Sequence, residues 1–327
     1  MNMSDSKNRC TKGYRCESCK AAKSCTDPAK SYIPDVRRGT RKLLSGKYGI
    51  LVAILLLAIG AALYFVMNQK TPIAADADAE FHFIDVGQGD AAMVISDDSV
   101  VVIDCGRASS SDVLTEYIRK YTDKIDCLVI SHPHEDHMGG MAALINEFEI
   151  GEIIMEGYDE FEEEAPAFYE RAYDAMVEHE LYPVLAVPGD SHTYGDISLT
   201  VLSPQHDYDD TNSNSIVLRL EVDGASAIFT GDAESAAERD ILESYCSELD
   251  ADILKIGHHG SSTSTSEKFY LAVSPDIAVI SCGAGNTYGH PHRETRELFE
   301  KYSQEYYRTD EEGSIVLVCR DGEIVKK

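Results

Sequence analysis

Basic residues are scarce over most of this 327-residue chain. Residues 71–327 carry 16 lysines and arginines against 53 aspartates and glutamates, a net charge of −37, whereas residues 1–70 carry 13 basic and 4 acidic residues, a net charge of +9. Affinity for nucleic acid normally depends on lysines and arginines that contact phosphates. No basic cluster with interleaved aromatic residues occurs after residue 70. The acidic part therefore lacks the usual surface for a polyanion, and the uneven charge indicates two environments.

Charge is absent from Ile50–Met67, an apolar run of 18 residues. With Tyr48 and Gly49 the run approaches the roughly 20 residues that a helix needs to cross a bilayer. Five basic residues lie between positions 37 and 47, and Lys70 alone follows before acidic residues dominate. The positive-inside rule then predicts a single-pass protein of the cell membrane, with its N-terminus in the cytoplasm and the remainder outside. A cleavable signal peptide is the alternative, but a leader of about fifty residues would be too long.

These features predict four segments: a cytoplasmic tail at 1–47, a transmembrane helix at 48–67, a linker at 68–79 and a globular domain at 80–327. Within the domain, short apolar segments separated by turn signals come first in each half, and helix–strand alternation follows. This order favours two mixed sheets packed together with helices outside. No tandem repeat occurs at the periods of solenoid proteins, so a repeat fold is excluded.

A disulfide framework is not expected, although the chain has nine cysteines. Cys10, Cys16, Cys19 and Cys25 lie in the basic tail, where a reducing compartment would keep them as thiols. Four cysteines around a central C-x2-C could bind a structural zinc ion, and a tail of free or lipid-modified thiols is the alternative. The other five cysteines lie mostly in apolar runs, which is typical of small buried core residues.

Metal-ligand side chains are concentrated in residues 131–140, which read SHPHEDHMGG. Residues two apart in an extended segment point the same way, so His132 and His134 could bind one cation together. After a turn, Asp136 and His137 could reach a second cation about 3.5–4 Å away. The apolar run before this segment predicts a buried strand. The segment is therefore interpreted as half of a two-metal hydrolytic site rather than as a solvated histidine-rich loop.

Other predicted strands also end in carboxylates. The segment FIDVGQGD offers Asp85 and Asp90, which are suited to orienting a metal-bound histidine, and an ordinary glycine-rich turn is the alternative. Farther along the chain, the apolar strand that ends in TGD offers Asp232. A dinuclear site needs a bridging carboxylate besides histidines, and Asp232 is the candidate.

Two later segments add histidines. In KIGHHGS, the adjacent His258 and His259 are not expected to point into one site, so one would be a ligand and the other structural or substrate-facing. The loop NTYGHPH carries His290. This residue is suited to general acid catalysis or to phosphate contact.

The ordered motifs IDVGQGDA, HPHEDH, TGD, KIGHHGS and NTYGHP resemble the metallo-β-lactamase superfamily and are most similar to the hydrolase domain of the ComEC competence-protein family. The resemblance covers roughly residues 80–325. It implies a four-layer αββα sandwich with two metals at one edge between the sheets. The ligands that it implies are His132 and His134 for the first metal, Asp136 and His258, with His137 beside them, for the second, and Asp232 as the bridge.

The same resemblance implies roles beyond metal binding. Asp85 would orient the metal-binding histidines, and Asp90 and His259 would support the ligands without binding the metals. Asp136 would orient the nucleophile, and His290 would face the substrate and stabilise charge or protonate the leaving group. Metal-assisted hydrolysis is the expected mechanism.

The sequence departs from the superfamily pattern in the loop Thr211–Ser215. Many members have a further metal-binding histidine there, whereas this chain has Asn212 and Asn214. Either His206, a few residues upstream, replaces this histidine, or water or an amide oxygen completes the first site. The histidine and oxygen ligands leave zinc and manganese both plausible. A second departure is that a transport channel needs many membrane spans, so a chain with one predicted span is not itself a DNA pore.

The implied substrate is a phosphodiester, either DNA or a small diester of the cell envelope. The net charge of −37 disfavours DNA, although the metals could attract phosphate locally. Hydrolysis of a lactam, amide or ester is one alternative. A non-catalytic sensor or assembly module that keeps the metal fold is another.

Overall fold

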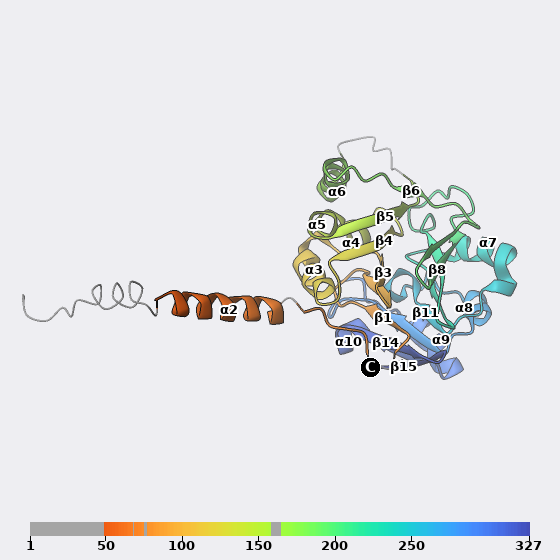
Figure 1. The fold of residues 1–327 in the computed structure, drawn as a ribbon. Coiled ribbons are helices and arrows are strands. Elements are labelled where there is room, and N and C mark those ends of the chain that lie inside the picture. Colours follow the sequence, from red (N-terminus) through yellow and green to blue (C-terminus); the bar gives the residue numbers. More distant parts are fainter. Residues whose placement is uncertain (1–48, 68, 75–76, 158–164) are drawn as a thin grey trace, which may run out of the picture. The chain divides into compact units, whose positions relative to one another are not determined.

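The computed structural model describes residues 49–67, 69–74, 77–157 and 165–327 (Figure 1). The four tail cysteines lie outside these residues, so the structural-zinc prediction stays a prediction. The chain divides into two units, which are described separately: residues up to Asn68 and residues Gln69–Lys327.

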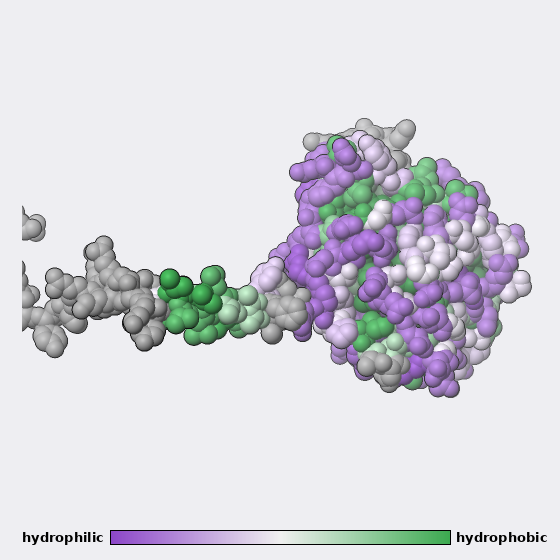
Figure 2. All heavy atoms as spheres, in the orientation of Figure 1, coloured by the Kyte–Doolittle hydropathy of each residue, from purple (hydrophilic) through white to green (hydrophobic). Residues whose placement is uncertain are grey.

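The first unit contains helix α2 (Gly49–Met67), which has no charged residue. Its described side chains are apolar on the face that Figure 2 shows. Its described side chains are largely exposed, and Ile50 and Leu57 each reach 74%. Over the residues whose side chains the structure describes, which end at Tyr64 in this helix, no helix is long and apolar enough to cross a membrane.

The second unit contains two sheets. The larger has the strand order β15-β14-β1-β2-β3-β4-β5-β6. Its strands are β1 (Ala79–Phe83), β2 (Ala92–Ser96), β3 (Ser99–Ile103), β4 (Lys124–Ile130), β5 (Glu149–Met155), β6 (Val184–Leu185), β14 (Ile315–Arg320) and β15 (Glu323–Lys326). The smaller has the order β13-β12-β11-β10-β9-β8-β7. Its strands are β7 (Ser191–Tyr194), β8 (Ile197–Ser203), β9 (Val217–Val222), β10 (Ala225–Phe229), β11 (Ile253–Lys255), β12 (Ile277–Ile280) and β13 (Glu305–Arg308).

Alternation along the strands builds three apolar layers. In β3, Val101 and Ile103 join the cluster between the two sheets, whereas Val100 and Val102 join the cluster on the outer face, because successive strand side chains point to opposite faces. Between the sheets, Phe83 stacks on Phe229 at 5.9 Å between ring centroids. Central strands such as β2 and β3 are therefore buried on both faces.

Helices cover both outer faces. On the larger sheet lie α3 (Ser111–Arg119), α5 (Met141–Glu147) and α6 (Ala167–Glu178), and on the smaller lie α7 (Ser235–Tyr245), α8 (Glu267–Val273) and α9 (Arg293–Tyr302). Short helices α4 (Glu135–Met138) and α10 (Thr309–Glu312) lie in connections. The layers therefore run helix, sheet, sheet, helix, and the predicted αββα sandwich is confirmed.

Residues 69–74 of the predicted linker contact the domain. The Thr71 N–H donates to the Lys120 carbonyl oxygen at 2.6 Å, and Ile73 packs against the outer apolar cluster. Strand β1 begins at Ala79. This part of the predicted linker is therefore bound to the domain surface.

Parallel strands bring the polar motifs together. Strands β3 and β4 are parallel, as are β10, β11 and β12, so their carboxyl ends meet at one edge of each sheet. Close backbone packing supports this edge: a Cβ at Gly140 would lie 2.2 Å from the Cys105 carbonyl oxygen. Only glycine lets the segment after β4 approach the loop after β3 this closely.

Candidate metal centre

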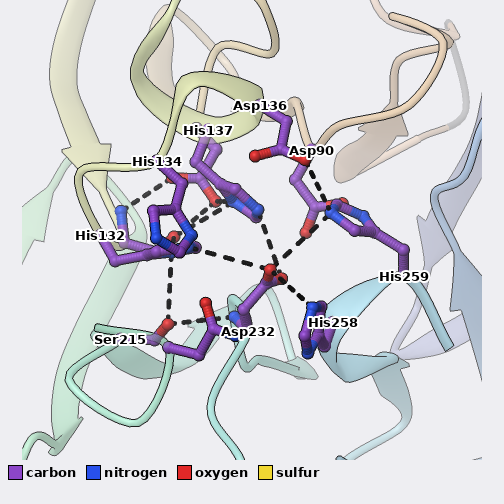
Figure 3. Close-up of polar contacts among 12 residues, drawn as sticks. Asp90, His132, His134, Asp136, His137, Ser215, Asp232, His258 and His259 are labelled. Atoms are coloured by element: carbon purple, nitrogen blue, oxygen red, sulfur yellow. Dashed lines mark hydrogen bonds and ion pairs between the residues drawn. The ribbon is translucent and has the colours of Figure 1, made fainter. Parts of the chain in front are cut away.

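The segment after β4 carries the first histidines of the site (Figure 3). His132 follows the strand and is fully buried, whereas His134 is exposed. The His132 Nε2 atom lies 3.0 Å from His134 Nδ1, so the two rings meet as predicted from their spacing. Helix α4 then carries Asp136 and the fully buried His137.

The carboxylate of Asp232 lies at the point where the histidines converge (Figure 3). Its Oδ1 atom is 3.3 Å from His137 Nε2. Its Oδ2 atom is 3.7 Å from His258 Nε2 and 3.8 Å from the Nε2 atoms of His132 and His259. Four imidazoles from two distant parts of the chain therefore surround one carboxylate.

Two groups of metal-ligand atoms share this carboxylate. Within each group the donor atoms lie within 4.8 Å of one another. The first group is His132, His134 and Asp232, and the second is Asp90, His137, Asp232 and His259. The sharing of Asp232 is the arrangement that the bridging role requires.

The donor set fits divalent cations. His137 Nε2, His259 Nε2 and Asp232 Oδ1 are buried and have no hydrogen-bond partner among the described residues. Buried polar atoms without partners are rare and costly, and these three face a common point. Cations coordinated there would satisfy all three, and nitrogen with carboxylate oxygen suits zinc or manganese.

The backbone at His258 and His259 overturns one expectation. Both residues adopt left-handed conformations, with φ of 47° and 54°, so the strand-like alternation that would separate their rings does not apply. Both Nε2 atoms approach Asp232. His259 is the buried member and belongs to the second donor group, whereas the predicted ligand His258 is partly exposed, with Nδ1 3.2 Å from Thr263 Oγ1. Such strained backbone is typical of functional sites.

Two buried carboxylates orient the imidazoles. Asp104 Oδ2 lies 2.8 Å from His137 Nδ1, and Asp90 Oδ1 lies 3.1 Å from His259 Nδ1. Holding Nδ1 in this way turns each Nε2 toward Asp232. The orienting role expected of Asp90 therefore has a structural basis, although Asp90 also lies in a donor group.

The orienting role expected of Asp85 belongs instead to Asp104. The Asp85 carboxylate accepts the Gly87 N–H at 3.0 Å, because the backbone turns directly after this residue. Among the described residues it makes no hydrogen bond or ion pair with a histidine. Asp104 was not identified from the sequence. Asp104 comes just after the apolar strand β3, and Asp232 comes shortly after β10. This shared position near the end of an apolar strand is the signal by which Asp104 could have been identified.

Replacing Asp104 by asparagine is expected to lower metal affinity or turnover about 10- to 100-fold, because the His137 ring loses its charged partner. Titration of the metal-free protein with manganese or zinc would measure the affinity. Asp98→Asn is the matched control, since Asp98 is exposed in the turn at the opposite end of β3. Equal affinity in both variants would contradict the orienting role.

The site opens into a pocket of about 540 Å³. Its lining includes the predicted site residues His134, Asp136, Asn212, Asp232, His258, His259 and His290, together with Gln88, Arg107, Pro133, Glu135, Pro166, Phe168, Thr211 and Tyr288. A substrate in this pocket would therefore contact both donor groups.

Comparison with known proteins identifies the family. Residues 84–284 match the family described as the metallo-beta-lactamase superfamily. The chain belongs to the metallo-β-lactamase superfamily. ComE operon protein 3 of Bacillus subtilis is 30% identical over 260 residues, which cover 73% of this chain and 33% of that protein. Competence protein ComA of Neisseria gonorrhoeae is 29% identical over 71% of this chain and 31% of its own length.

The expected resemblance to ComEC-family competence proteins is thus confirmed, and the chain spans about a third of the length of these relatives. Among solved structures, the diiron β-hydroxylase CmlA of Streptomyces venezuelae is similar over 74% of this chain and 54% of its own, with 12% identity and a TM-score of 0.51. That likeness shows the fold. The metallo-β-lactamase fold binds divalent metals, in agreement with the two donor groups.

The loop where many superfamily members have a further histidine contributes Thr211 and Asn212 to the pocket. Asn212 lines the pocket, and its Oδ1 atom is buried without a hydrogen-bond partner among the described residues. Asn214 is turned away, because its Oδ1 accepts the Tyr208 N–H at 2.7 Å. His206 does not replace the missing histidine, since it is exposed and its Nε2 lies 3.0 Å from Asp240 Oδ2.

The charges of the superfamily site are set by burial and by neighbours. Burial alone would raise the pKa of the Asp232 carboxyl, but His137 and His259 outweigh it and hold the pKa well below its usual value. Burial, followed by the nearby His137, lowers the pKa of His132 well below its ordinary value. Asp232 is therefore ionised and His132 neutral at neutral pH, the states that metal binding requires.

His290 faces the pocket beside His258, with 5.6 Å between ring centroids. Burial, then the neighbouring His259 and His292, lowers the pKa of His290 to about 4. The ring is therefore neutral near pH 7 in the protein alone. In that state it can donate a hydrogen bond to a substrate, whereas donation of a proton would require protonation first.

Proposed function

We propose that this chain is a metal-dependent phosphodiesterase or nuclease, anchored in the cell membrane with its domain outside the cytoplasm. The observation that carries the proposal is the Asp232 carboxylate shared by two donor groups at an open pocket. The relationship to competence proteins supports a phosphodiester such as DNA as the substrate. The uncharged run at 50–67 and the basic residues before it support the membrane anchor.

Divalent cations at the two donor groups would lower the pKa of a water molecule and neutralise charge on the phosphoryl oxygens. The protein's own groups would orient the reaction. Burial would raise the pKa of Asp136, but His259 and His137 hold it far below its usual value, so its carboxylate can accept a hydrogen bond from the attacking water. Neutral His290 can donate one to the substrate.

The balance of charges favours a particular form of substrate. A domain with a net charge of −37 repels a long duplex, and repulsion grows with the number of phosphates near the surface. A small diester or a short single strand brings fewer phosphates. We therefore expect faster cleavage of these substrates than of duplex DNA.

The test uses the purified chain, freed of metal and reloaded with manganese or zinc separately. Substrates are bis(p-nitrophenyl) phosphate, single-stranded DNA, duplex DNA, glycerophosphocholine, p-nitrophenyl acetate and a cephalosporin. Metal-dependent cleavage of a diester is the expected result, with the chelated protein as the control. Cleavage of only the ester or the cephalosporin would overturn the assignment in favour of amide or ester hydrolysis, and no bound metal with no turnover would favour a non-catalytic module.

The anchor is tested independently of activity. Fractionation of cells that express the chain is expected to leave it in the membrane fraction after a high-salt wash. Protease added to intact spheroplasts or protoplasts should digest the domain. Release by salt, or protection from protease, would contradict the proposed topology.

A further inference from the structure

Arg107 is the one lysine or arginine among the described residues that line the pocket. It follows Gly106 in the loop after β3. Its Nε–H donates to the Gln88 carbonyl oxygen at 3.1 Å, and the Gln88 Oε1 atom in turn accepts the Gly283 N–H at 3.0 Å. The guanidinium is therefore held by Gln88, which also lines the pocket and links loops of both sheets.

The ion pair between Arg107 and Asp136 is longer than is usual for an arginine with a structural role. Its Nη2 atom lies 3.6 Å from Asp136 Oδ2, and its side chain is 34% exposed. Elsewhere in the same molecule, Arg308 makes two bonds to the Asp310 carboxylate at 3.0 and 2.7 Å. That bidentate geometry is what a structural arginine achieves. Arg107 has no such partner among the described residues, so part of its guanidinium is available to a ligand in the pocket.

An exposed aromatic ring lies beside this cation. Tyr288 lines the same pocket as Arg107 and is 57% exposed. One face of its ring stacks on His290, with 5.6 Å between centroids and 21° between planes. The backbone at Tyr288 is fixed by a contact of 3.2 Å between its carbonyl oxygen and His292 Nε2. A supported ring with an exposed side is suited to stacking against a planar ligand.

We infer that Arg107 and Tyr288 form a subsite that holds a phosphate and the adjacent base of a nucleic-acid strand beside the candidate metal centre. This inference rests on the proposed phosphodiesterase function and narrows its substrate to nucleotidyl diesters. Arginine binds phosphate oxygens through its planar fork, and stacking on a tyrosine tolerates any base. A choline-type head group would leave the ring without a planar partner.

The subsite also accounts for how an acidic domain could accept a nucleic acid. Binding through one arginine needs no extended basic surface, so its dependence on salt is small. For a single strand, each phosphate contact contributes about −0.7 to the slope of log K against log salt. Removal of Arg107 is therefore expected to change the slope by about this amount.

The experiment compares variants of the full-length, metal-loaded chain in detergent. The substrates are a short oligothymidylate and an abasic oligomer with the same number of phosphates. The variants are Arg107→Gln, Arg107→Lys, Tyr288→Leu and Tyr288→Phe. Arg171→Gln is the matched control, because Arg171 is exposed on α6.

Arg107→Gln is expected to raise KM about tenfold for both oligomers, with kcat changed less than KM, whereas Arg171→Gln should leave both constants unchanged. Arg107→Lys should recover part of the loss. Tyr288→Leu should raise KM about tenfold for oligothymidylate and change KM for the abasic oligomer much less, whereas Tyr288→Phe keeps the stacking and most of the affinity. Equal increases in KM for the two oligomers in Tyr288→Leu, or no increase for oligothymidylate in Arg107→Gln, would overturn the subsite.

Failure of the proposed phosphodiesterase function can be distinguished from failure of the subsite. If the unmodified chain cleaves no diester, the phosphodiesterase assignment is wrong, and binding of fluorescent oligothymidylate to the metal-loaded chain then tests the subsite. Weaker binding by Arg107→Gln than by Arg171→Gln would support the subsite without catalysis. Equal binding by these two variants would overturn it.

Discussion

Replacing Asp232 by asparagine is expected to reduce turnover about a thousandfold or more, the scale on which loss of a preorganised electrostatic group acts. Asp232 is shared by both donor groups, and its Oδ1 and Oδ2 atoms approach four imidazoles. An amide has one oxygen and no negative charge, so it could not balance two cations. Turnover of bis(p-nitrophenyl) phosphate and bound metal per chain would measure the effect.

The same substitution is not expected to unfold the domain. The side chain of Asp232 is at the sheet edge, outside the three apolar clusters. Circular dichroism of the metal-free variant should match that of the unmodified metal-free chain, and Asp98→Asn should retain full turnover. Unchanged turnover in Asp232→Asn would remove the bridging role and with it the proposed dinuclear site.

Replacing Lys255 by methionine is expected to destabilise the metal-free domain by about 3–5 kcal/mol, the usual cost of breaking a buried ion pair. The Lys255 Nζ atom lies 2.6 Å from Asp90 Oδ2, and the two side chains are only 3% and 6% exposed. Without the ammonium, the Asp90 charge would remain buried beside His259 alone. Urea unfolding with a chelator present would measure the change.

The pH dependence of this effect follows from Asp90. Burial raises the pKa of its carboxyl, but Lys255 and His259 outweigh burial and lower the pKa to about 2. Because this lies below the value of about 3.9 in an unfolded chain, ionised Asp90 stabilises the fold above that value. The stabilisation is lost as pH falls toward 2. Lys255→Met should therefore lose the most stability near neutral pH and less in acid.

Two controls test whether loss of the Lys255–Asp90 ion pair causes the destabilisation. Lys124→Met removes an exposed lysine that pairs with Asp126 and should leave the urea midpoint unchanged. The double variant Lys255→Met/Asp90→Asn should be less destabilised than Lys255→Met, because no buried charge is left alone. A double variant as unstable as the single one would show that packing of the lysine stem, not its charge, is responsible.

Much of the fold and part of the site could be predicted because local rules determine them. Continuous apolar runs, such as SVVVI in β3, indicate strands buried on both faces. The two-residue spacing of His132 and His134 places their rings together, because residues two apart in an extended segment point the same way. Asp232 could be identified because a carboxylate in the turn that follows a buried strand, here β10, lies at the sheet edge.

The remaining parts of the site depend on contacts between residues far apart in the sequence. His259 meets Asp90 across 169 positions, and the left-handed backbone that turns it inward is not specified by the letters HH. Asp104 and Arg107 acquire their roles only when β3 and β4 align in parallel and the loops at their ends meet. The sequence alone thus determined which segments carry the candidate metal ligands. The tertiary structure decided which carboxylate orients which imidazole, because sheet register and loop conformation depend on packing of the whole domain.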